Sequence, residues 1–278
     1  EENIPEPEPA PEIPEEPPVP ELTSQEKLDM IVDARIEVMP LEDKVAGLFI
    51  VTPESITGVE TAVKAGDGTK EALTKYAVGG IIYSDRNIKS AEQFKEMLDN
   101  TKMYAGYPLF LAMEEEGGTV SPLSKSKIAE QPGSAADIAG TGDAANAYQA
   151  GAAIGAVFAD YGMNLDLAPV ADLNSVEGSV VGSRSFGSDA AAAAPYVTSM
   201  LKGLQDSNVT VCLKHFPGMG STAQDTAEGL AITQRSAEDF RANEFEVFRA
   251  GIEAGAEMVM VSNLSAPMLT GDNTPCAL

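Results

Sequence analysis

Short apolar runs alternate with amphipathic segments along most of this chain. The runs are four to six residues long and predict β-strands at residues 48–51, 80–83, 109–113, 165–170, 209–213 and 258–262. Apolar residues at helical spacing predict helices at 90–102, 143–161, 189–205 and 236–254. Strands that are apolar throughout and are each followed by a helix indicate a parallel sheet covered on both faces.

Two helices are expected before the first strand. Thr23 and Glu26 have the spacing of a capping box, which predicts that a helix begins here. Apolar residues follow at helical intervals, at Leu28, Ile31, Val32 and Ile36. Pro40 interrupts this pattern, and a second short helix is predicted over residues 41–46.

Polar side chains cluster directly after several of the predicted strands. These residues are Glu114, Glu115, Glu116, Asp172, Asn174, Lys214, His215 and Asn263. Because the segment after the first strand lacks a glycine-rich fingerprint, a dinucleotide-binding open sheet is disfavoured. Polar residues at the carboxyl ends of many strands favour a TIM-type (β/α)8 barrel. About six βα units can be counted, so two are expected to be missing at the C-terminal end.

The first 22 residues differ in composition from the rest of the chain. They hold eight Glu and eight Pro and no basic residue. Charge repulsion and the fixed φ of proline favour an extended, disordered linker over residues 1–22. The barrel domain is then expected over 23–278. Because such spacers separate a secretion signal or surface anchor from an outer domain, we expect an extracytoplasmic protein, secreted or surface-anchored.

The formal net charge of −25 narrows the set of partners. It would repel a phosphate backbone, so nucleic acid is not expected as a ligand. No stretch approaches 18 consecutive apolar residues, so no membrane-spanning segment is expected. His215 is the only histidine, and Cys212 and Cys276 cannot make a zinc ribbon, so no metal or other cofactor is expected. Cys212 lies in an apolar run and is interpreted as a buried thiol.

Six segments resemble the N-terminal barrel of glycoside hydrolase family 3, in its bacterial β-N-acetylhexosaminidase branch. Residues 108–118, PLFLAMEEEGG, look like the family string P-L-hydrophobic-D-Q-E-G-G-R-V, and residues 164–174, NLDLAPVADLN, resemble N-L-D-F-A-P-V-x-D-V-N. The others are MPLEDKV at 39–45, VGGII with NIKS at 78–90, RSFGSD at 184–189 and KHFPG at 214–218. Their order and spacing identify the chain as a member of this family.

The resemblance implies that Glu114, Arg184, Lys214 and His215 bind a saccharide. Sugar hydroxyls need carboxylate acceptors and cationic or imidazole donors in one concave site. Other readings of these residues stay open: Arg184 could lock a loop, and residues 114–116 could form a solvated acidic turn. Asp166 is interpreted as a structural hydrogen-bond acceptor. Lys214 and His215, directly after an apolar strand, are costly to bury unless they are paired.

The chain departs from the family pattern where catalysis is concerned. No segment matches G-V-V-x-S-D-D, which carries the nucleophilic Asp of the family. The loop K-H-F-P-G-H-G-D-T-x-x-D-S-H keeps Asp225 as a candidate acid–base partner. In this chain Ala227 replaces the catalytic His at the end of that string. Met219 replaces the His that follows K-H-F-P-G, and Ser221 replaces the first Asp. Thr119 and Pro122 replace the arginines of E-G-G-R-V-x-R.

Two functions follow from these matches and departures. In the first, the parent protein hydrolyses β-O-glycosidic bonds of N-acetylglucosaminides or related sugars, while this chain alone is inactive. In the second, the protein is a non-catalytic saccharide-binding or cell-envelope interaction module.

Overall fold

A computed structural model describes residues 22–130 and 132–278. The expected linker at 1–22 lies, except for Leu22, outside the described residues. The chain divides into two compact units, residues 1–44 and residues 45–278, and each is described by itself. None of the helices within the described ranges is long and apolar enough to cross a membrane.

The first unit contains helix α1 (Ser24–Val38), which begins as the sequence predicts. The Thr23 hydroxyl accepts a hydrogen bond from the Glu26 N–H, and the Glu26 carboxylate accepts one from the Thr23 N–H at 2.7 Å. This reciprocal pair satisfies two of the amide donors that every helix leaves open at its start. The short helix α2 (Leu41–Ala46) is also confirmed.

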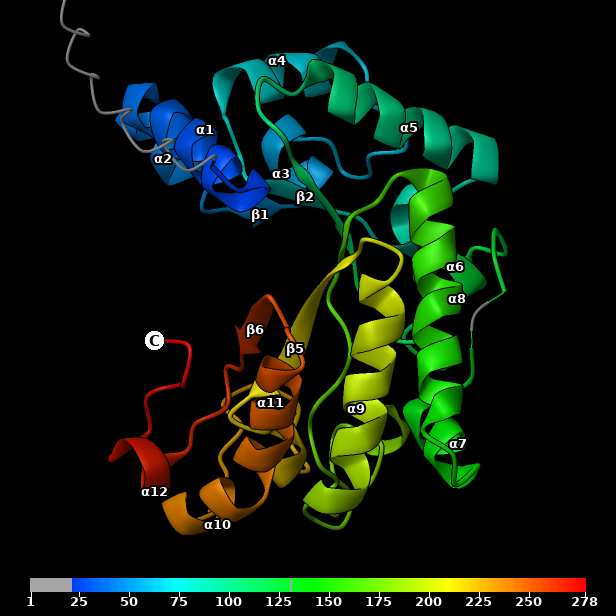
Figure 1. The fold of residues 1–278 in the computed structure, drawn as a ribbon, viewed down its shortest axis with the longest axis vertical. Helices are drawn as coiled ribbons and strands as arrows, with labels where there is room; N and C mark the ends of the chain where they lie inside the picture. Colours follow the sequence, from blue (N-terminus) through cyan, green and yellow to red (C-terminus); the bar gives the residue numbers. More distant parts are fainter. Residues whose placement is uncertain (1–21, 131) are drawn as a thin grey trace, which may run out of the picture. The chain divides into compact units, whose positions relative to one another are not determined.

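The second unit is built on a parallel sheet whose six strands follow one another in sequence order, β1-β2-β3-β4-β5-β6. The strands are β1 (Ile50–Val51), β2 (Gly80–Ile82), β3 (Phe110–Met113), β4 (Leu165–Asp166), β5 (Thr210–Phe216) and β6 (Met258–Val261). They curl into half of a barrel, and helices lie along the outside of the strands (Figure 1). The predicted TIM-type fold with six βα units is therefore confirmed.

Helices connect the strands of this unit. They are α3 (Pro53–Thr57), α4 (Asp67–Lys75), α5 (Ala91–Tyr104), α6 (Pro122–Lys125), α7 (Ala135–Gly140), α8 (Ala145–Tyr161), α9 (Ala190–Gln205), α10 (Ala237–Ala242), α11 (Glu244–Glu253) and α12 (Pro267–Thr270). Short 3₁₀ turns are η1 (Asp85–Asn87), η2 (Gly182–Arg184) and η3 (Met219–Ser221). Ser90 caps α5 and Asp189 caps α9, so both helices begin within one residue of the predicted start.

Several predicted elements were wrong in detail: β4 ends at Asp166 instead of residue 170, and β1 begins at Ile50 instead of residue 48. The strand predicted to end at residue 213 continues to Phe216, so Lys214 and His215 lie inside β5. It can continue because both side chains find partners in the interior, which removes the cost of burying them unpaired. The helix predicted over 236–254 is two helices, broken at Asn243, whose backbone (φ −130°, ψ −82°) leaves the helical region.

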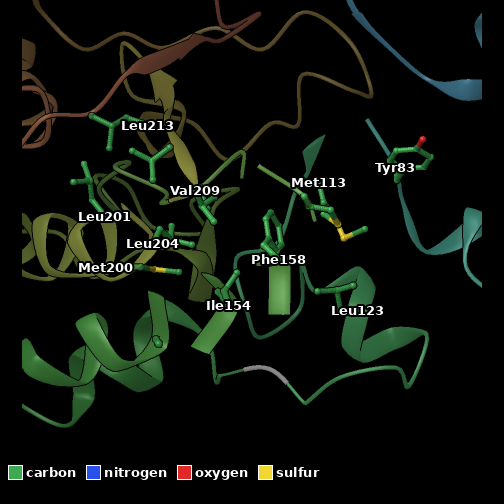
Figure 2. Close-up of a cluster of buried hydrophobic side chains, with 14 of the residues drawn as sticks. Tyr83, Met113, Leu123, Ile154, Phe158, Met200, Leu201, Leu204, Val209 and Leu213 are labelled. Atoms are coloured by element: carbon green, nitrogen blue, oxygen red, sulfur yellow. The ribbon is translucent and has the colours of Figure 1, made fainter. Parts of the chain in front are cut away.

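The central strands β3, β4 and β5 bury both of their faces, as the continuous apolar runs indicate, whereas the edge strands β1 and β6 stay partly exposed, at Ile50, Val259 and Val261. On the helix-covered face, side chains of α8 and α9 such as Ile154, Phe158 and Leu204 pack against strand residues such as Met113 (Figure 2). On the other face, Ala112, Leu165 and Cys212 form a smaller buried cluster. Successive strand residues alternate between these two faces, and this alternation also decides where the polar residues at the strand ends point.

Helices α8 and α9 lie side by side (Figure 1) and approach each other at glycines. A Cβ atom on Gly151 would lie 2.1 Å from the carbonyl oxygen of Met200. A Cβ atom on Gly203 would lie 2.2 Å from the carbonyl oxygen of Tyr148. Both contacts are with backbone, which cannot move aside as a side-chain rotamer can, so these positions require glycine.

We predict that Gly151→Ala destabilises the protein by about 2 kcal/mol or more, because the clash outweighs the gain in helix propensity of about 1 kcal/mol. Urea unfolding measures this difference. Gly68→Ala is the matched control: Gly68 lies in α4 with no atom within 4 Å of its added Cβ, so this change should stabilise slightly. A Gly151→Ala protein as stable as the wild type would contradict the close packing of α8 and α9.

Candidate functional site

The site is built around Lys214, which β5 places in the interior with no exposed side-chain surface. Its Nζ lies 2.5 Å from Oε1 of Glu114 and 2.6 Å from Oε1 of Glu116. A buried ammonium group is stable only when it is paired and hydrogen-bonded, and these two carboxylates supply both conditions. Glu114 and Glu116 follow β3, so the contact joins the carboxyl ends of two strands.

Arg184 joins the same cluster from the 3₁₀ turn η2. Its Nε and Nη2 donate to the two carboxylate oxygens of Glu116 at 2.8 and 2.6 Å, and Nη2 lies 3.8 Å from Glu114. This bidentate geometry fixes the guanidinium plane. Burial by itself raises the pKa of Glu116, but Arg184 and Lys214 outweigh it and hold that pKa below its ordinary value.

His215 is oriented by a buried carboxylate. Its Nδ1 lies 2.6 Å from Oδ2 of Asp172, which also accepts a hydrogen bond from the His215 backbone N–H at 3.1 Å. The other carboxylate oxygen of Asp172 accepts from the Met219 N–H at 2.7 Å. Asp172 therefore fixes the imidazole ring and leaves Nε2 directed away from itself.

Glu114 is the most open member of the cluster, with 42% of its side chain exposed. It also lines a cavity of about 330 Å³ together with Tyr83, Arg86 and Lys125. The Glu114 carboxylate therefore contacts Lys214 and Arg184 and also lines this cavity. The arrangement presents the Glu114 carboxylate and the partly exposed Arg184 guanidinium at the carboxyl ends of the strands, with the Lys214 ammonium buried beneath them. An acceptor beside a cationic donor is chemistry suited to a polyhydroxylated ligand.

The sequence-predicted residues are brought together with one exception. Glu114, Arg184 and Lys214 are in contact, and His215 follows Lys214 directly. Asp225 instead accepts a hydrogen bond from the Ala227 N–H at 2.8 Å, within its own loop. Within the described residues its carboxylate forms no ion pair with this cluster.

Two residues of this cluster were not singled out from the sequence. Glu116 is the main partner of Arg184 and Lys214, although the sequence left residues 114–116 open as a solvated turn. Asp172 orients His215 but was noted only as one polar residue among several. Strand alternation was a usable signal for Glu116, because it places Glu114 and Glu116 on one face and Glu115 on the other. No local pattern pairs Asp172 with His215.

Glu115 points to the other side of the sheet. Its Oε2 accepts a hydrogen bond from the Leu123 N–H of α6 at 3.0 Å, and its own N–H donates to Asp166 at 2.9 Å. The interpretation of Asp166 as a structural acceptor is thereby confirmed. Burial raises the pKa of Glu115 to about 7 and raises that of Asp166 well above its ordinary value.

Neither cysteine is in a disulfide, and Cys212 is buried, as expected for a core thiol. Burial raises the pKa of the Cys212 thiol to about 11, so it is not a reactive thiolate. No group of three or more His, Cys, Asp or Glu in the part of the chain that the structure describes could hold a metal ion.

The fold and this cluster define a barrel domain with a polar site at the carboxyl ends of its strands. The chain belongs to glycosyl hydrolase family 3, because the N terminal domain of that family matches residues 40–278. A beta-hexosaminidase of Xylella fastidiosa is 32% identical over 195 residues, which are 69% of this chain and 58% of that protein. The beta-hexosaminidase LpqI of Mycobacterium tuberculosis is 33% identical over 232 residues, 82% of this chain and 56% of LpqI.

Solved structures give the same result. A family 3 beta-N-acetylglucosaminidase from Paenibacillus has a TM-score of 0.78 at 30% identity, covering 86% of this chain and 44% of that one. NagZ from Neisseria gonorrhoeae, in complex with N-trifluoroacetyl-D-glucosamine, has a TM-score of 0.70 at 28% identity, covering 77% of this chain and 63% of NagZ. The chain spans a little over half the length of the curated relatives above.

We predict that Glu116→Gln destabilises the protein by about 3 kcal/mol, because it removes the charge that compensates Arg184 and Lys214 in a buried setting. Chemical denaturation measures the change. Glu246→Gln is the control, since Glu246 pairs with Arg249 on the surface, and its loss should cost less than about 1 kcal/mol. Equal effects in the two variants would mean that the cluster contributes no more than a surface ion pair.

Proposed function

We propose that the whole protein hydrolyses β-linked N-acetylglucosaminides or related glycosides, and that this chain provides the saccharide-binding half of its site. The observation that carries the proposal is the convergence of Glu114, Arg184 and Lys214 into one cluster. The similarity to beta-hexosaminidases and to a NagZ that holds a glucosamine derivative supports the choice of sugar.

Each group has a role that follows from its chemistry. Glu114 accepts hydrogen bonds from sugar hydroxyls, because its carboxylate is the exposed one and lines the cavity. Arg184, which is partly exposed, donates to sugar oxygens, and the buried Lys214 holds the carboxylates of Glu114 and Glu116 in place for the ligand. His215, held at Nδ1 by Asp172, offers Nε2 to the ligand. No nucleic acid is proposed as a partner, since the net charge of −25 opposes it.

We do not expect this chain alone to catalyse hydrolysis. The chain contains no match to the family string that carries the nucleophile, and Ala227 stands where that family has the loop histidine. A methyl group cannot transfer a proton, and Asp225 is engaged within its own loop. The alternative function, a non-catalytic saccharide-binding or cell-envelope module, is favoured by these same substitutions.

We also propose an extracytoplasmic location, secreted or anchored at the cell surface through a segment upstream of residue 1. The support is compositional, since the first 22 residues combine eight Glu with eight Pro. Protease accessibility of the protein on intact cells would test it, because a cytoplasmic protein resists cleavage until the cells are lysed.

We predict that Arg184→Ala weakens binding of N-acetylglucosamine at least about tenfold, because a charge-assisted hydrogen bond contributes about 1.5–3 kcal/mol. Isothermal titration calorimetry measures the affinity. Arg249→Ala is the matched control: Arg249 pairs with Glu246 on the surface, so affinity should not change. Unchanged affinity in Arg184→Ala, with folding verified by circular dichroism, would remove Arg184 from the site.

Turnover of nitrophenyl N-acetylglucosaminide by the whole protein separates the two functions. Hydrolysis above the buffer rate supports the glycosidase. Sugar binding without hydrolysis supports the binding module. Absence of both would reject the saccharide site itself.

A further inference from the structure

Two buried carboxyl groups lie directly behind the proposed saccharide site and have no part in the function described above. Glu115 and Asp166 both have no exposed surface. Oδ1 of Asp166 accepts the Glu115 N–H at 2.9 Å, and Oε2 of Glu115 accepts the Leu123 N–H at 3.0 Å. Asp166 thus holds the backbone between Glu114 and Glu116, the two carboxylates that face Lys214.

Each of these carboxyl groups has one oxygen without a partner. Within the described residues, Oε1 of Glu115 and Oδ2 of Asp166 are buried and accept no hydrogen bond. The Ser121 hydroxyl and the N–H groups of Leu123 and Gly117 lie near Glu115 and lower its pKa, but burial outweighs them. Buried carboxylate oxygens are normally satisfied, so a pair left open in one place needs an explanation.

The surrounding charges do not compensate two further anions. The titratable groups that act on the pair are Glu116 from its own segment and Lys214 and Cys212 from β5. Lys214 is already paired with Glu114 and Glu116, and Arg184 is paired with Glu116. The charges of Lys214 and Arg184 are therefore already balanced by Glu114 and Glu116. No cation among the described residues of this cluster is left to balance Glu115 and Asp166. If both were ionised, two negative charges would be buried without a counterion, at high cost.

We propose that Glu115 and Asp166 together hold a proton at neutral pH, and that this proton keeps the segment 114–116 in place for the ligand. The acid form of one group removes one of two buried negative charges that would otherwise repel each other. The proton stays within the pair, and no other group is consumed or released. Glu115 and Asp166 act as positioning residues, since the contacts of both are with protein groups behind the site.

The family string has a neutral isostere of Glu at position 115. Where this chain has Glu115, the family string has Gln, whose amide donates a hydrogen bond without titrating. A protonated Glu115 reproduces that donor, whereas an ionised one does not. This chain therefore carries a titratable group at a position that needs a donor, which makes the site sensitive to pH.

The sign of the stability effect follows from the raised pKa of Glu115, about 7 in the folded protein against an ordinary value of 4.5. Below the ordinary value both folded and unfolded chains are protonated, and the full stability is present. Between the two values only the folded chain holds the proton, so stability falls as pH rises. Above the folded value the loss is complete. Because the pair is coupled, the titration belongs to both groups together.

Glu115→Gln tests the proposal without reference to any ligand. The folding equilibrium constant of the variant, divided by that of the wild type, should rise about tenfold per pH unit from about pH 5 to about pH 7 and then level off. Glu253→Gln, at an exposed position with a formal charge change of the same size, should give a ratio independent of pH. A flat ratio for Glu115→Gln would overturn the proposal.

A second measurement covers the case in which Glu115→Gln perturbs folding. Infrared spectroscopy of the wild type at neutral pH should show the carbonyl band of a buried protonated carboxyl group. Either Glu115→Gln or Asp166→Asn should alter this band, and Glu253→Gln should not. A wild-type spectrum without this band would overturn the proposal.

The effect of the buried proton on sugar binding rests on the proposed function. It can be tested separately from the proton itself. Affinity for N-acetylglucosamine should fall by about tenfold per pH unit once the pair has lost its proton, and Glu115→Gln should remove this fall. A fall that persists in the variant would overturn the positioning role. A wild type that binds no sugar at any pH, but gives the rising stability ratio, would reject the saccharide site and keep the buried proton.

Discussion

The ion pairs of Lys214 with Glu114 and Glu116 are the interaction on which the site depends. A lysine with no exposed side-chain surface requires anionic partners in place, and β3 supplies both at the point where it ends. These pairs tie the ends of β3 and β5, between which β4 runs in the sheet. Arg184 then shares Glu116, so a turn far along the chain is fixed to the same charges.

Because neighbouring side chains alternate between two faces, the three consecutive glutamates have two different environments. Glu114 and Glu116 face the cations, and Glu115 faces α6 and Asp166 on the opposite side. Three neighbouring carboxylates on a flexible turn would repel each other in water. At the end of a buried strand, two are neutralised by cations and the third is held in a setting that favours its acid form. The electrostatics of the site are therefore a consequence of the sheet geometry.

The differences from the family pattern concern catalysis more than binding. Glu114 contacts both Arg184 and Lys214, whereas the loop that carries Asp225 has Ala227 where the family has a histidine. The chain also spans a little over half the length of these curated relatives.

The sequence by itself determined the class of the fold, because apolar runs followed by amphipathic helices have few solutions other than a parallel α/β sheet. It also located Glu114, Arg184, Lys214 and His215 through motif order. The tertiary structure alone decided that Asp172 orients His215, since 43 residues separate them and no local pattern joins them. It likewise decided that Lys214 lies inside β5, because a charged residue continues a buried strand only when distant carboxylates receive it.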